Sequence, residues 1–163
     1  MKGGEDLGLF AMGWWPVPVG CHSILIARLQ GDLAGANSSF AAVREQMNQK
    51  IQKSPQNAAP LLSQLAVVDA LLGKKEVAIS EAKRAIELFP ISNDALRGPR
   101  TLVNLAVVYA WTNELDLAFA TLDSVTKTPF GIYYGELKLN PMWDPLRKDP
   151  RFDNMLAELA PRD

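Results

Sequence analysis

LGKKEVAISEAKRAIELFP, residues 72–90, has the pattern of a turn followed by an amphipathic helix with a defined end. Gly73 permits a backbone conformation that a residue with a Cβ atom resists. Pro90 cannot continue a helix, so we predict that the helix stops just before it. The apolar and small side chains between them recur at the three- and four-residue spacing of one helical face. They are Val77, Ala78, Ala82, Ala85, Ile86, Leu88 and Phe89.

A second helix is predicted before Gly73, and it must fold back antiparallel to the first. Its apolar positions, with one carboxylate among them, are Leu62, Leu65, Ala66, Asp69, Leu71 and Leu72. The small side chains of Ala78, Ala82 and Ala85 let the two helices approach closely.

This helix pair resembles a tetratricopeptide repeat. The residues that stand at the spacing of the signature positions of that family are Leu62, Leu65, Ala66, Gly73, Ala78, Ala82, Ala85 and Pro90. Asp69 departs from the family pattern, because the family usually has Tyr at that position. The resemblance implies an all-α fold in which helix-turn-helix repeats stack into a right-handed superhelix, an α-solenoid.

Two further pairs flank the central one, so three repeats are predicted. A short helix over HSILIARLQ (22–30) leads through Gly31 into a long helix over Leu33–Lys53. The third pair turns at Asn113, which can take the left-handed conformation that Gly takes elsewhere. The turns at Gly31, Gly73 and Asn113 are spaced by 42 (73 − 31) and 40 (113 − 73) residues. We place the repeats at residues 21–55, 59–92 and 99–130.

The C-terminal segment, residues 131–163, predicts a helical cap over the last repeat. Asn140-Pro141 and Asp149-Pro150 each combine a capping side chain with proline at the first helical position, so each opens a short helix. A repeat stack needs such an atypical end. The run PMWDPLRKDPRF (141–152) is similar to the tail of long bacterial proteins in which repeats follow a kinase, cyclase or winged-helix domain. That similarity implies an interaction module in signalling, and it transfers no activity.

The N-terminal segment, residues 1–20, is apolar and irregular, and no charge occurs from Leu7 to Ala27. A transmembrane helix is one interpretation, but the glycines and prolines of this segment disfavour it. A lipoprotein signal before Cys21 is a second, and it predicts an envelope-anchored protein. We favour the third, an irregular arm of a cytoplasmic protein whose aromatic residues cover an exposed helix end.

Composition and motifs argue against several function classes. The net charge is −1 with charges of both signs mixed, so no nucleic-acid partner is expected. The sequence has no Gly-rich phosphate loop, no HExxH and no zinc-spaced Cys/His cluster, so we expect no cofactor, no metal and no enzymatic activity. A small enzyme that uses Cys21 and His22 remains an alternative, because a thiol beside an imidazole is a nucleophile–base combination.

The resemblance implies a concave groove lined by the first helix of each pair, and the groove is the predicted partner site. Its expected lining residues are Arg28, Ser63, Val67, Leu71, Arg100, Asn104, Val107 and Trp111. The apolar lining, with Trp111 as anchor, suits a peptide or helix of a protein partner, or the arm of a second copy in a homodimer. No membrane partner is expected. The alternative is that Trp111 and the valines pack on the chain's own tail or arm.

Overall fold

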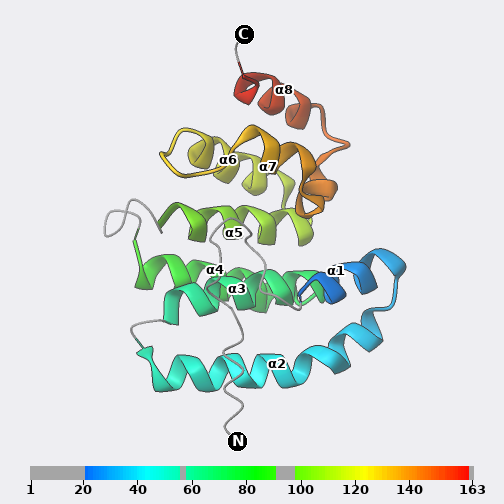
Figure 1. The fold of residues 1–163 in the computed structure, drawn as a ribbon, viewed down its shortest axis with the longest axis vertical. Coiled ribbons are helices and arrows are strands. Elements are labelled where there is room, and N and C mark those ends of the chain that lie inside the picture. The colour runs from blue at the N-terminus through cyan, green and yellow to red at the C-terminus, as the bar shows by residue number, and fades with distance from the viewer. Residues whose placement is uncertain (1–20, 56–57, 91–97, 162–163) are drawn as a thin grey trace, which may run out of the picture.

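The computed structural model describes residues 21–55, 58–90 and 98–161, which form helices and turns without any strand. The predicted all-α fold class is confirmed. Figure 1 shows the helices stacked in layers along the longest axis, with α2 at one end and α8 at the other. The predicted arm, residues 1–20, lies outside the described residues, as do residues 91–97 between Pro90 and Gly98. Nowhere in the described ranges is a helix both long and apolar enough to cross a membrane.

Six helices form three consecutive pairs. The pairs are α1 (Cys21–Gln30) with α2 (Leu33–Lys53), α3 (Ala58–Leu71) with α4 (Lys75–Leu88), and α5 (Gly98–Trp111) with α6 (Leu115–Thr126). The helices predicted from the sequence in these regions are therefore confirmed, including the bounds of the long second helix.

The same turn closes each pair. Gly31, Gly73 and Asn113 have φ of 81°, 80° and 62°, as the sequence predicted for these positions. At Gly73 the backbone N–H donates to the carbonyl of Ala70 (3.0 Å), and the N–H of Lys74 donates to that of Asp69 (2.8 Å). These are the two hydrogen bonds of a Schellman motif, and equivalent bonds occur at the other two turns.

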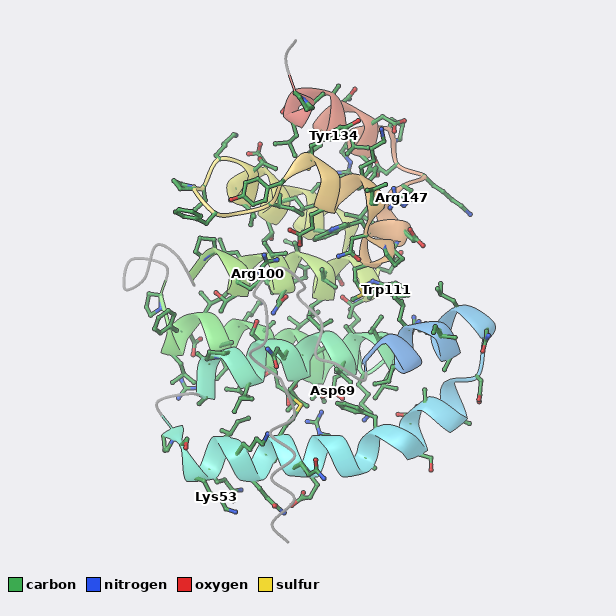
Figure 2. The ribbon with its side chains drawn as sticks, viewed as in Figure 1. Lys53, Asp69, Arg100, Trp111, Tyr134 and Arg147 are labelled. Carbon is green, nitrogen blue, oxygen red and sulfur yellow. The ribbon has the colours of Figure 1, made fainter. Side chains whose placement is uncertain are left out.

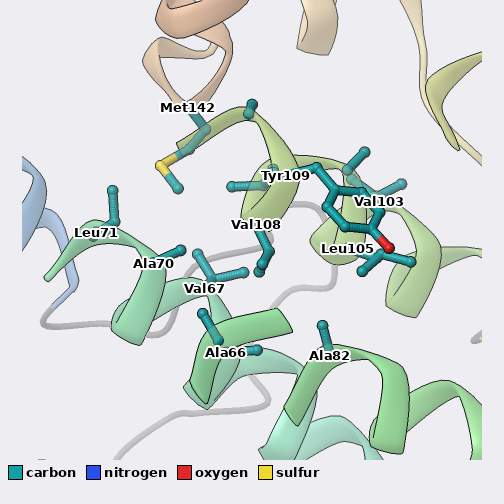
Figure 3. Close-up of a cluster of buried hydrophobic side chains, with 14 of the residues drawn as sticks. Ala66, Val67, Ala70, Leu71, Ala82, Val103, Leu105, Val108, Tyr109 and Met142 are labelled. Carbon is teal, nitrogen blue, oxygen red and sulfur yellow. The ribbon is translucent and has the colours of Figure 1, made fainter. Parts of the chain in front are cut away.

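The core lies between consecutive pairs. Helix α3 packs on α1, α2, α4 and α5, which explains why it is apolar on nearly all sides and not amphipathic. Figure 3 shows Val67 of α3 facing Val108 of α5 in this core, and both side chains are fully buried. Ala78, Ala82 and Ala85 of α4 are buried as well, in keeping with the predicted close approach of α3 and α4.

The tail forms α7 (Tyr134–Leu139), the 3-10 helix η3 (Pro141–Leu146) and α8 (Pro150–Leu159). The two short helices predicted for the tail are present as η3 and α8. The first predicted tail helix is of the 3-10 type, because Pro145 lies inside it and has no N–H for an α-helical bond. Helix α7 was not predicted, and no side chain caps its start at Tyr133. Both predicted caps are confirmed: Asn140 accepts from the N–H of Met142, and Asp149 from that of Arg151, each at 3.0 Å.

Candidate interaction surface

The predicted groove residues stand on α1, α3 and α5, but most of them are not accessible. Ser63, Val67, Leu71, Asn104 and Val107 are buried, with exposed fractions of 3% or less. Arg28, Arg100 and Trp111 are half-buried. The set therefore does not form an open groove in this conformation, and its binding to a partner stays a prediction.

Arg28 joins three helices at one edge of the stack. Its Nη1 atom donates to the carbonyl of Leu71 at the end of α3 (2.7 Å), where the helix dipole favours a cation. Its guanidinium carbon lies 5.5 Å from the ring centroid of Trp111 at the end of α5, within cation–π range. The ends of α3 and α5 are thus both covered by a side chain of α1.

Trp111 also contacts the tail. Its indole Nε1–H donates to the carbonyl of Met142 in η3 (2.9 Å). Figure 2 shows Trp111 at the edge where the end of α5 approaches η3 and α1. For Trp111, the alternative interpretation that it packs on the chain's own tail is confirmed.

The other polar groove residues are likewise bonded within the chain. Asn104 donates to the hydroxyl of Ser63 (2.8 Å), which links α5 to α3. Arg100 forms an ion pair with Glu136 of α7 (2.9 Å). Burial raises the pKa of Glu136 above its ordinary value, and Arg100 opposes that shift. These donors are therefore committed to internal acceptors.

Sequence reasoning missed an ion cluster formed by Asp69, Arg44, Glu81 and Lys74. Asp69 is fully buried on α3, and its carboxylate is paired with Arg44 of α2. Arg44 also pairs with Glu81 of α4 (2.8 Å), and the Nζ atom of Lys74 lies 3.3 Å from Asp69 Oδ1. Burial raises the pKa of Glu81, and the charge of Arg44 and its hydrogen bond oppose the shift. The signal was the departure of Asp69 from the family pattern.

One exposed aromatic residue has a strained backbone. The N–H of Gly131 donates to the carbonyl of Thr128 (3.0 Å), which closes a turn with Pro129 and Phe130 in its centre. Phe130 has φ of 60°, the conformation that the third residue of a type II turn needs and that Gly usually supplies. Its side chain is 57% exposed.

The described residues offer no metal site, since they bring no three His, Cys, Asp or Glu side chains together in a suitable group. Cys21 and His22 belong to the first turn of α1. Their side chains lie outside what the structure describes, and the alternative of a catalytic pair stays a hypothesis.

Comparisons of the chain with protein-family models, with curated proteins and with solved structures found no match.

Proposed function

We propose that this chain is a non-enzymatic protein–protein interaction module built from tetratricopeptide-like repeats. The observation that carries the proposal is the recurrence of one turn, with the same two hydrogen bonds, at Gly31, Gly73 and Asn113. Each turn joins two antiparallel helices, and the first helices of successive pairs pack on one another. Repetition of one supersecondary unit in this way is how helical-repeat proteins build extended binding surfaces.

The two ends of the stack support the proposal. The exposed face of α2 carries Glu45, Gln49 and Lys53, and that of α8 carries Asp153 and Glu158. Polar outer faces close a repeat stack and keep it soluble. We therefore place the functional surface along the stack and not at its ends.

The proposed working surface is the part of the predicted groove that remains half-exposed, around Arg28 and Trp111. Tryptophan and arginine are the residues most often found to dominate binding energy at protein interfaces. The partner is a peptide or helix of another protein, in a bacterial signalling role that rests on the similarity of the tail. The arm of a second copy is the other proposed partner, and it would give a homodimer.

The test compares two arginine variants as bait for partners from the host. Arg28→Ala removes a cation of the proposed surface. Arg84→Ala removes one from the exposed face of α4, where Arg84 pairs with Glu87 one turn away. Circular dichroism establishes that both variants are folded. We expect Arg28→Ala to lose partners that both wild type and Arg84→Ala recover. Identical recovery with all three proteins would refute the assignment of this surface.

Sedimentation tests the homodimer separately. The full chain and a variant without residues 1–20 are compared at the same concentrations. A dimer that is lost on deletion supports exchange of the arm, whereas a monomer in both cases refutes the homodimer and leaves the surface for a different protein.

A further inference from the structure

Within the surface proposed above, the ring of Trp111 is covered by Arg28 of α1. Ile24 and Leu25 of α1 are buried, and Arg28 binds the end of α3 and stacks over Trp111. A partner that uses Trp111 as a deep anchor therefore competes with α1. Access to this surface depends on how firmly the first pair is attached to the rest of the stack.

Helix α2 attaches through an interface that is ionic at its centre. Its described buried apolar residues are Ala36, Phe40 and Met47. Arg44 lies between Phe40 and Met47 at the four- and three-residue spacing of one helical face. From this face Arg44 reaches Asp69 of α3 and Glu81 of α4.

The partner of Arg44 makes this interface unusual. Asp69 has Leu65 one turn before it and Leu72 nearly one turn after it, so the carboxylate interrupts an apolar stripe of α3. A buried carboxylate without a cation is costly, and Arg44 arrives only when α2 is docked. Lys74, in contrast, belongs to the turn that follows α3 and stays beside Asp69 in any case.

Opening of this interface differs from opening of an apolar one. When α2 leaves, the charged groups of Arg44, Asp69 and Glu81 regain water, which offsets part of the lost attraction. Separation of α3 from α4 would instead expose mainly alanines and leucines, whose contact with water is unfavourable. Regions of a native protein that open at lower free energy than the whole are expected where buried apolar contact is small.

We propose that α1 and α2 open and close on the rest of the stack as one unit, latched by Arg44, and thereby gate the surface around Trp111. Within the unit, two hydrogen bonds to carbonyls of α1 fix the turn at Gly31, and α1 and α2 contact each other. The regulatory meaning of the gate rests on the proposed function, but the opening itself needs no partner to be measured.

Hydrogen exchange followed by mass spectrometry on the full chain tests the opening. Arg44→Met is compared with Arg84→Met, the same change at an exposed arginine that pairs with Glu87 of its own helix. For Arg44→Met we expect at least tenfold faster exchange of the amides of α1 and α2, with the amides of α6 unchanged. Arg84→Met should leave both regions unchanged. Acceleration spread evenly over the whole chain, or none in α2, would overturn the proposal.

A triple variant guards against misfolding of Arg44→Met, which leaves two carboxylates without their arginine. In R44M/D69L/E81Q the charges of Arg44, Asp69 and Glu81 are all removed, and of the cluster only Lys74, in the exposed turn after α3, stays charged. We expect exchange in α1 and α2 to be slower than in wild type. If this variant opens as readily as Arg44→Met, the ion cluster is not the latch. Because no partner takes part, a failed latch is distinguishable from a failed partner capture with Arg28→Ala.

Discussion

Replacing Trp143 with alanine tests whether the tail is part of the cooperative fold. Trp143 lies in η3, is fully buried and belongs to the main apolar cluster together with Leu137 and Phe152. A buried tryptophan removes about 150–250 Å² from water, worth about 4–6 kcal/mol at roughly 25 cal/mol per Å². Replacement of a buried tryptophan or phenylalanine by alanine typically lowers the free energy of unfolding by about 3–5 kcal/mol. For a chain of this size, that loss lowers the melting temperature by roughly 6–20 °C.

The matched control is Trp143→Phe. The indole N–H of Trp143 is buried and has no acceptor among the described residues, and such a group costs about 1–3 kcal/mol. Phenylalanine removes this donor but leaves a small cavity, so we expect the free energy of unfolding to stay within about 1 kcal/mol of wild type. Urea unfolding followed by far-ultraviolet circular dichroism measures both variants. A Trp143→Ala protein as stable as wild type would show that the tail folds independently of the repeats and would refute the reasoning.

Three further changes probe separate features. Ala78→Leu forces extra volume between α3 and α4, so we expect the free energy of unfolding measured with urea to fall by about 1–3 kcal/mol. The control is Ser80→Leu, on the exposed side of α4. Equal stability of the two variants would contradict the close contact at Ala78. Phe130→Gly relieves the strain of the left-handed backbone at this position and should raise the free energy of unfolding by about 1 kcal/mol. A lower free energy of unfolding in this variant would mean that the ring of Phe130 stabilises the fold. Burial raises the pKa of Glu136, so the folded state binds the proton of this carboxyl group more tightly than the unfolded state does. The stabilisation by this proton is fully present below the ordinary pKa of 4.5 and is lost as the pH rises through the raised pKa. Glu136→Gln should remove this part of the pH dependence of urea unfolding, whereas an unchanged profile would show that Glu136 does not titrate differently on folding.

The repeated pairs are predictable because their signals are local. Each turn needs a positive φ, and Gly31, Gly73 and Asn113 are residues that accept it. The apolar spacing on either side then fixes two helices, and their short connection makes them antiparallel. The same holds for the caps of the tail, where an acceptor side chain followed by proline specifies the first turn of a helix.

The state of the candidate surface is not predictable in this way, because it depends on contacts far apart in the sequence. Trp111 is held by a main-chain carbonyl of Met142, and a carbonyl leaves no mark in the sequence. From the sequence, Arg100 is expected to be an available donor, but in the fold α7 places Glu136 beside it. Helix α7 itself has no capping signal in the sequence. The sequence therefore assigns the predicted groove residues to the right helices, but it offers their burial only as an alternative.

Asp69 connects the sequence pattern to the proposed regulation. A tyrosine at this position, as in the family that the repeat resembles, would fill the space beside α2 with a ring and needs no counter-ion. A carboxylate fills less space and needs a cation, which Arg44 supplies from α2. The two residues therefore depend on each other, and together they replace apolar packing by charge pairing at the attachment of the first helix pair. The tail is attached mainly through the buried ring of Trp143, with the neutral hydrogen bond of Trp111 and the ion pair of Arg100 with Glu136 beside it. At the attachment of the first helix pair, in contrast, the charge pair itself is buried, because Asp69 is fully buried and Arg44 is its partner from α2. We therefore expect the attachment of the first helix pair to respond strongly to the loss of the single charge of Arg44.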